Sequence, residues 1–286
     1  MNLAIFVLSL LPLVCGPRLV SAQAFGGPDA DEHMRESQKL TAAARQLHNQ
    51  AAQSHEKNRF RVLLDPGHTP EHPGAISSQG RAERGYNQNI AGMLLKRLAG
   101  DGDIEVSLTN GPQDTVENAD RAKLANELGV DVFLSIHHDS VQEIYLSTWA
   151  FEGAERRYCD RFHGYSVLVA DDKPKPLAEK SYLLADILAR KMLERSFTPT
   201  LHHAEPIAGE NRKLLDRAKG IYERNDLAVF RPNQRPAVLI ECGVIVNREE
   251  ERELQDPAAQ ARIVEALYDA VREYKSKLST AAVPTR

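Results

Sequence analysis

The sequence has few cysteines and no large excess of charge of either sign. Only 3 of its 286 residues are cysteine, which excludes a disulfide-rich scaffold. Lys and Arg number 36 against 40 Asp and Glu, and these charges are dispersed along the chain. This balance gives no reason to expect nucleic acid or an anionic membrane as a partner. Hydrophobic residues make up 42%, enough for a substantial core in one large or two small domains.

Long apolar runs are also scarce. The longest, from Leu3 to Cys15, is too short to span a bilayer comfortably, and small residues suited to cleavage follow it. Residues 1–22 are therefore interpreted as a secretory signal peptide, cleaved after Ala22 or Ala24. The run lacks a preceding Lys or Arg, which leaves an uncleaved anchor open. We expect an exported protein of the periplasm or extracellular cell wall, with no membrane span after signal cleavage.

The rest of the chain divides into an arm, a domain and a tail. Residues 23–58 are polar and Ala-rich with apolar residues at near-helical spacing, which predicts a helical N-terminal arm. The arm would pack on the domain surface or bind a partner. Residues 59–278 form the single predicted catalytic domain, and residues 279–286 form a short C-terminal tail.

Short apolar runs alternate with helical patterns throughout the predicted domain. This alternation predicts an α/β fold, with an open, twisted, mostly parallel sheet covered by helices on both faces. The expected strands are Phe60 to Leu64, Ile104 to Leu108, Val130 to Ile136, Tyr165 to Val169 and Ala237 to Ile240. The expected helices are Asn87 to Leu98, Asn118 to Leu128, Leu177 to Leu193 and Pro257 to Leu278.

Three of the apolar runs lead into residues that bind metals. His68 follows the first run, His137 ends the third, and Glu241 directly follows the last. Functional sites in open α/β sheets lie at the carboxyl ends of strands, so these side chains are candidates for one site. A carboxylate in so apolar a stretch costs on the order of several kcal/mol unless something pairs with it or it protonates.

A metal ion is an economical partner for these residues. Catalytic zinc takes three nitrogen or oxygen ligands from the protein and leaves a fourth position for water, whose pKa it lowers to about 7. Two histidines supply nitrogen, and a third ligand is expected near His68. Glu83 lies just before a helical run, where spacing alone leaves two interpretations open, a metal ligand or a residue that favours the helix start.

The polar motifs together resemble those of the zinc-dependent N-acetylmuramoyl-L-alanine amidases. The resemblance extends in order from Phe60 to about Glu250 and implies one Zn²⁺ per chain, held by His68, Glu83 and His137. It also implies that Glu241 is the catalytic acid/base, and that the substrate is the amide between N-acetylmuramic acid and L-alanine in peptidoglycan. The motifs that carry it are Asp65-Pro66-Gly67-His68, Gly74-Ala75, Glu83 with Asn87, Arg121 to Asn126, Ser135-Ile136-His137, and Pro236 to Glu241 with Asn247 and Glu250.

The chain departs from the family pattern at three places. Thr69 stands where a second glycine is usual, and Asn110 stands where an arginine often follows the second strand. Neither is expected to touch a proposed ligand. Residues 197–216 are longer than the family minimum, and some relatives use this part of the chain to cover the zinc. A regulatory protein partner is therefore expected to bind through the N-terminal arm or residues 197–216.

Several polar residues near the proposed ligands have a structural interpretation. Asp65 and Asp139 are candidates to accept hydrogen bonds from the ligand histidines. Strand alternation turns His138 away from the face that His137 uses, so His138 is expected to be structural. His202 and His203 are expected in a polar loop that could contact substrate.

Three further residues are assigned from their position in helices and strands. Cys242 should face the core opposite Glu241, so a disulfide between Cys159 and Cys242 is not expected. Arg121 and Asn126 are interpreted as an ion pair on a helix face and a helix cap, respectively.

Two other functions fit part of the pattern. Zinc exopeptidases of the open α/β class also use two histidines, one glutamate as ligand and a separate glutamate. A catalytically silent cell-wall-binding regulator is the third alternative, although such proteins usually lack the general base that Glu241 would provide.

Overall fold

The computed structural model describes residues 59–111 and 114–281. The predicted signal peptide, residues 1–22, and the predicted arm, residues 23–58, lie outside the described residues. Residues 282–286 of the predicted tail do so too, whereas residues 279–281 continue the last helix.

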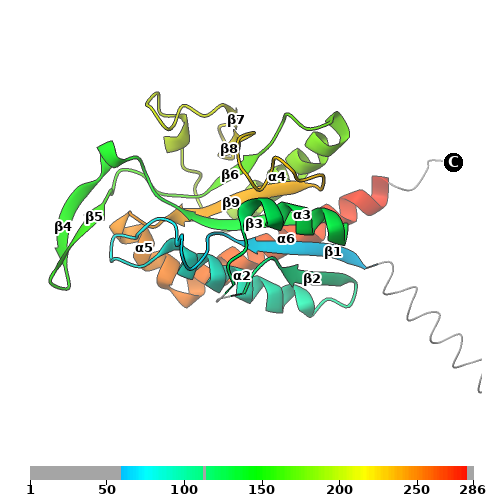
Figure 1. Cartoon of the computed structure of the whole chain (residues 1–286), viewed down its shortest axis with the longest axis horizontal. Helices are drawn as coiled ribbons and strands as arrows, with labels where there is room; N and C mark the ends of the chain where they lie inside the picture. Colours follow the sequence, from blue (N-terminus) through cyan, green and yellow to red (C-terminus); the bar gives the residue numbers. More distant parts are fainter. Residues whose placement is uncertain (1–58, 112–113, 282–286) are drawn as a thin grey trace, which may run out of the picture. The chain divides into compact units, whose positions relative to one another are not determined.

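One sheet of seven strands forms the centre of the described domain (Figure 1). Its strand order is β2-β1-β3-β9-β6-β8-β7. The first four of these run parallel, β6 is antiparallel to β9, β8 is parallel to β6, and β7 is antiparallel to β8. The strands are β1 (Phe60–Pro66), β2 (Ile104–Leu108), β3 (Val132–Asp139), β6 (Ser166–Val169), β7 (Leu214–Asp216), β8 (Ile221–Glu223) and β9 (Ala237–Val244).

Helices cover both faces of the sheet. The helices are α2 (Glu83–Ala99), α3 (Asn118–Leu128), α4 (Lys175–Glu194), α5 (Arg248–Gln255) and α6 (Pro257–Ala281). Buried residues of α2, α4 and α6 form one core cluster with alternate residues of the strands, such as Leu134 and Ile136 of β3. Phe133, which precedes Leu134, belongs to a second cluster with Ala125 of α3. Period-two alternation in β3 thus divides the core in two, and the predicted α/β fold is confirmed.

The predicted strands and helices all occur, several of them longer than expected. The prediction missed α5, β7 and β8, together with the hairpin of β4 (Ser147–Phe151) and β5 (Ala154–Tyr158). Its description of the sheet as mostly parallel holds for the half that contains β1, β3 and β9. The missed strands are three to five residues long, too short for a clear periodic pattern, and α5 is almost wholly charged.

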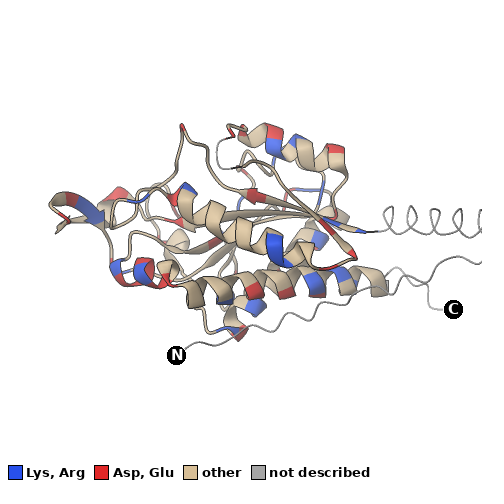
Figure 2. Cartoon of the chain, turned by 90° about the horizontal axis from the view of Figure 1, so that it is seen from below, with Lys and Arg blue, Asp and Glu red and all other residues tan. Residues whose placement is uncertain are grey.

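The surface and the cysteines agree with the composition. In Figure 2 acidic and basic residues alternate along the visible helices instead of forming a patch of one sign. Among the described residues, no helix is long and apolar enough to cross a bilayer. Cys159 and Cys242 are both buried and free, and Cys242 lies in the larger core cluster as expected.

Candidate metal centre

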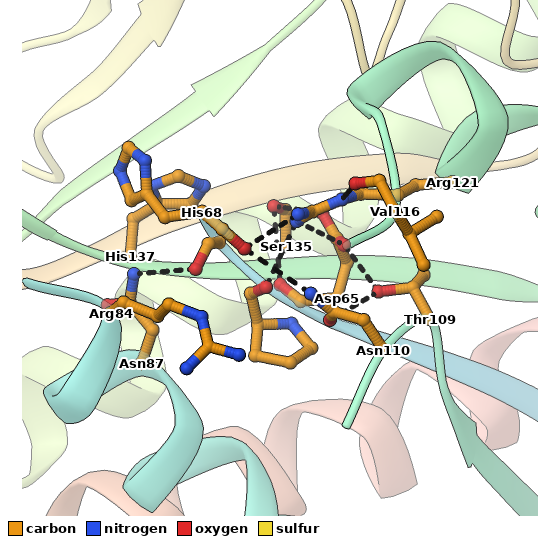
Figure 3. Close-up of polar contacts among 12 residues, drawn as sticks. Asp65, His68, Arg84, Asn87, Thr109, Asn110, Val116, Arg121, Ser135 and His137 are labelled. Atoms are coloured by element: carbon orange, nitrogen blue, oxygen red, sulfur yellow. Dashed lines mark hydrogen bonds and ion pairs between the residues drawn. The ribbon is translucent and has the colours of Figure 1, made fainter. Parts of the chain in front are cut away.

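Three residues predicted as ligands meet at the carboxyl end of the parallel strands. His68 follows β1, Glu83 is the first residue of α2, and His137 lies near the end of β3. Glu83 Oε2 is 2.9 Å from His68 Nε2, and Glu83 Oε1 is 2.9 Å from His137 Nδ1. Figure 3 shows the two imidazoles side by side, and their ring centroids are 4.9 Å apart. We call these three residues the first cluster.

Backbone geometry makes this close approach possible. A Cβ atom at Gly67 would collide with the His137 ring, and a Cβ atom at Gly74 would collide with Glu83 and His68. Gly74 also has φ +80°, which side chains other than glycine rarely adopt. His68 itself has φ 74°, an unfavourable conformation for a non-glycine residue. The loop between β1 and α2 is therefore shaped around the first cluster.

The Glu83 carboxylate is buried but well supplied with donors. Burial raises its pKa, but hydrogen bonds from His137 and His68 outweigh burial and hold the pKa well below its usual range. The backbone N–H of Ala75 donates to Oε2 at 3.0 Å, and the Asn87 amide donates to Oε1 at 3.1 Å. Glu83 is therefore a carboxylate at neutral pH, the form that binds a cation.

Glu241 lies next to the first cluster in the sheet. In the register between β3 and β9, Glu241 is paired with His137. Its Oε2 is enclosed and has no hydrogen-bond partner among the described residues. Burial raises the pKa of Glu241 well above its usual range, and repulsion from Asp139 and Glu83 adds to the effect. A carboxyl group in this setting is suited to take up and release a proton.

Arg121 of α3 supports the backbone of the first cluster, a role that the sequence prediction missed. Its side chain is completely buried, and it pairs with Asp65 at 3.1 Å (Figure 3). It also donates to the carbonyl oxygens of Pro66 at 3.0 Å and His68 at 2.7 Å. The prediction of an ion pair was right, but the pair lies in the interior and not on a helix face. The available signal was the helical spacing of Arg121 to Ala122 and Ala125, the other buried residues of α3.

Two expectations about the surroundings of the ligand histidines were wrong. Asp65 accepts hydrogen bonds from Arg121, Thr109 and Ser135, and not from the ligand histidines. Asp139 instead faces His202 and His203. Both carboxylates are close to the ligands in sequence, but side-chain direction and the neighbouring elements determine their partners.

Asn110 also differs from expectation, because its amide donates to the carbonyl oxygen of His68 at 3.3 Å. It therefore touches the backbone of a proposed ligand. Asn126 is not a helix cap; its side chain bonds Pro232 and Gln234 in the loop before β9. His138 points to α2, where its Nδ1 lies 2.8 Å from the Asn87 side chain. Its position away from the face of His137 agrees with the expected alternation.

The expectation of a polar loop at His202 and His203 was wrong. Both lie in the short 3₁₀ helix η2 (His202–Ala204) and are buried. The donor atoms of Asp139, His202 and His203 lie within 4.8 Å of one another, and so do those of the first cluster. Within the described residues these are the two groups that could hold a metal ion.

The first cluster fits zinc by its donor chemistry. It offers two imidazole nitrogens and one ionised carboxylate, the donor types of catalytic zinc sites with three protein ligands. The two histidine side chains retain some exposure, 28% for His68 and 17% for His137, so the site is open to solvent on one side. Glu241 is the register partner of His137 on the neighbouring strand.

Comparison with known proteins gives the same picture. The sequence profile of a family described as N-acetylmuramoyl-L-alanine amidase matches residues 62–273. The chain is 27% identical over 225 residues to N-acetylmuramoyl-L-alanine amidase AmiA of Escherichia coli, covering 74% of this chain and 75% of AmiA. It is 23% identical to AmiC of the same species, over 77% of this chain and 54% of AmiC.

A solved structure shares the fold. The amidase Ami1 from Mycobacterium smegmatis superposes with a TM-score of 0.60 at 17% identity, covering 76% of this chain and 97% of Ami1. Together with the profile match, this confirms the resemblance that the motifs indicated and the α/β fold that it implies.

Proposed function

Because the chain belongs to the N-acetylmuramoyl-L-alanine amidase family, we propose that it hydrolyses the amide between N-acetylmuramic acid and L-alanine in peptidoglycan. We assign the zinc ligands to His68, Glu83 and His137, and the acid/base to Glu241. The observation that carries this proposal is the meeting of these four side chains, from β1, α2, β3 and β9, at one edge of the sheet.

When bound, zinc would polarise the scissile carbonyl and make water a nucleophile at neutral pH. Glu241 would accept the proton of that water at Oε2 and donate it to the leaving nitrogen. The amide C–N bond breaks, the lactyl group becomes a carboxylate, and L-alanine leaves as an amine. The unpaired, enclosed Oε2 and the raised pKa of Glu241 support this role.

The residues around the first cluster would keep its geometry fixed during the reaction. Arg121 and Asn110 hold the His68 carbonyl, and Asn87 and Ala75 hold the Glu83 carboxylate. Such support reduces the reorganisation that a metal site needs when substrate arrives.

The decisive test is the variant Glu241→Gln. Removing an acid/base of this kind lowers the rate by about 10²- to 10⁴-fold, while the ligands remain. Release of stem peptides from purified sacculi should fall accordingly, with zinc content unchanged by elemental analysis. Glu253→Gln, on the exposed side of α5, is the matched control and should release peptides at the wild-type rate.

Unchanged release by Glu241→Gln would refute the assigned mechanism. Mass spectrometry of the products identifies the bond: peptides that begin with L-alanine, together with a free lactyl carboxylate, are expected. Cleavage inside the stem would indicate an exopeptidase. Binding of zinc-loaded wild-type protein to sacculi without turnover would indicate a silent regulator.

We further propose that the protein acts after export, in the periplasm or the extracellular cell wall, on the basis of the predicted signal peptide. A regulatory partner would bind through the N-terminal arm or residues 197–216. Fusion of residues 1–24 to a reporter enzyme that works only outside the cytoplasm tests export. Loss of reporter activity on replacing Leu8 and Leu10 with Arg is the expected result.

A further inference from the structure

A second cluster, formed by Asp139, His202 and His203, is not used by the proposed reaction. It joins the end of β3 to the segment between α4 and β7. Asp139 Oδ2 lies 3.2 Å from His202 Nε2 and 2.9 Å from His203 Nε2. Despite these distances, none of the three atoms has a hydrogen-bond partner among the described residues, and all three are enclosed. Buried polar atoms are rarely left in this state.

The outer nitrogens of the two histidines determine what the inner nitrogens can do. His203 Nδ1 lies 3.0 Å from Glu210 Oε2. Gln142 Nε2 donates to the other oxygen of Glu210, Oε1, at 3.0 Å. A carboxylate can only accept, so His203 carries hydrogen on Nδ1. A metal ion bound at Nε2 would take the place of the second ring proton and use the Nε2 lone pair.

His202 has a similar arrangement. Its Nδ1 lies 2.9 Å from the Thr200 hydroxyl, which can accept a hydrogen bond from the ring. In the tautomer that donates to Thr200 through Nδ1, Nε2 presents a lone pair toward the same Asp139 oxygen. In the metal-bound form three lone pairs, two from imidazole nitrogens and one from the Asp139 carboxylate, would converge in this enclosed space, and the cation between them would offset their repulsion.

We propose that Asp139, His202 and His203 bind a second divalent cation of the zinc class. Two imidazole nitrogens and one carboxylate oxygen are the donors that zinc accepts, and they are softer than the all-oxygen sets of calcium and magnesium. Glu210 provides the carboxylate that commonly orients a metal-bound histidine through its other nitrogen. The site resembles the first cluster in composition but is more enclosed, with side chains 12%, 1% and 9% exposed.

The bound ion would link residues 200–213 to β3 of the sheet, because Asp139 lies on β3 and both histidines lie in that segment. This segment includes η2 and the turn at Gly209, and in Figure 1 it lies above β9 and beside β8. Apart from the histidines, Glu210 ties it to Gln142 at 3.0 Å, and Glu205 ties it to Tyr145 at 3.1 Å. Opening of the segment would separate His202 and His203 from Asp139, so the ion stabilises the closed form by mass action.

The number of zinc ions bound per full-length chain tests the second site. Protein stripped with a chelator is reloaded with ZnCl₂, freed of excess metal and analysed for zinc per chain. We expect two zinc ions in the wild type, one in His203→Ala and one in His137→Ala. His163→Ala is the control, because His163 is exposed and belongs to neither cluster; it should retain two.

Glu210→Gln is a second variant that keeps all three ligands, so it distinguishes a weakened zinc site from a misfolded protein. It should retain the second zinc with affinity lowered at least about tenfold, measured by competition with a chromophoric chelator. A protease provides a further readout that does not involve activity. In His137→Ala, zinc at 100 times its Kd should slow trypsin cleavage at Arg212 and Lys213 about 100-fold, with no slowing in His203→Ala.

One zinc per chain in both wild type and His203→Ala, with folded protein by circular dichroism, would overturn the second site. That outcome would leave the proposed amidase reaction intact if Glu241→Gln still abolished peptide release. Protonated histidines would then account for the cluster. Conversely, two zinc ions without any peptide release would support the second site and refute the proposed function.

Discussion

The two clusters each combine two histidines with one carboxylate but are built from different parts of the chain. In the first cluster His137 lies near the end of β3, Glu83 is the first residue of α2, and His68 lies in the loop directly after β1. The second shares β3 but is completed by a 3₁₀ turn in a long connection. The first is open to solvent at His68, and the second is enclosed by aromatic rings, with the ring centroids of Phe162 and Tyr222 each 5.4 Å from that of a histidine.

This difference shows that donor type alone does not define a site's role. A catalytic metal needs an open coordination position and a neighbouring acid/base, and the first cluster has solvent access and Glu241. A structural metal is enclosed and joins segments distant in sequence, as the second cluster joins residues 139 and 203. The backbone around each cluster, rather than its donor atoms, separates the two proposed roles.

The largest expected effect comes from removing one ligand of each cluster. His137→Ala should abolish release of stem peptides, because Glu241 would lose the activated water on which it acts. His203→Ala should lose a zinc ion but continue to release peptides. Parallel sacculus assays and zinc analysis check this contrast. Loss of peptide release in both variants to the same extent would break the distinction between the clusters.

The next largest effect concerns the buried support of the first cluster. Arg121→Met removes the cationic partner of Asp65 and leaves a buried carboxylate, so the free energy of unfolding should fall by about 3–5 kcal/mol. Urea unfolding at constant zinc measures this. Lys123, on the exposed side of the same helix, offers a matched control, and Lys123→Met should cost less than about 1 kcal/mol. Equal costs would show that Arg121 is not a structural support.

A third prediction contrasts carboxylates with and without histidine partners. Among the described residues Glu250 accepts from backbone donors alone, Gly164 at 2.8 Å and Val244 at 2.9 Å. Burial, its largest influence, raises its pKa to about 7. Between the ordinary value of 4.5 and about 7, the folded chain therefore binds more protons than the unfolded chain. Stability should fall by about 3 kcal/mol as pH rises through this window and then level off.

Glu250→Gln should lack this fall, whereas Glu249→Gln, an exposed neighbour, should retain it. The measurement is urea unfolding of each variant at about pH 5 and about pH 8, on either side of the window. Parallel pH profiles for wild type and Glu250→Gln would contradict the prediction. For Glu83 the sign is opposite, because histidine partners lower its pKa and its contribution is lost on acidification.

The smallest expected effects come from glycine substitutions in the loop between β1 and α2 and in residues 200–213. Gly74→Ala places a methyl group against Glu83 and His68 at φ +80°, and Gly209→Ala places one against Gln142 at φ +88°. Each costs about 1–2 kcal/mol for the left-handed backbone. Gly74→Ala should weaken zinc binding at the first cluster only, and Gly209→Ala at the second only. Zinc competition in His203→Ala and His137→Ala backgrounds separates the two sites.

The periodic part of the fold was predictable because its signals are local. Apolar alternation in β1, β3 and β9 and helical spacing in α4 and α6 depend on residues near one another in sequence. The rule that strand ends carry the site placed His68, His137 and Glu241 together, and the structure brings them to one edge. Short elements such as β7 and β8 carry too few residues for such a signal.

The partners of buried polar residues could not be predicted in this way. Asp65 pairs with Arg121 across 56 positions, and Asp139 meets His203 in a connection much further along the chain. Nothing in the local sequence around these residues specifies the other member of the pair. His202 and His203 looked like a polar loop because a histidine pair carries no periodic signal, and only the return of their segment to β3 buries them.

By itself, then, the sequence determined the class of fold, the edge of the sheet where the proposed ligands lie and the residue types that meet there. These follow from hydrophobic periodicity and from the direction of parallel strands, which are properties of short stretches of chain. Only the tertiary structure decided which carboxylate faces which imidazole, and which cluster is open to solvent. Those contacts join residues far apart along the chain, and burial, not spacing, selects their partners.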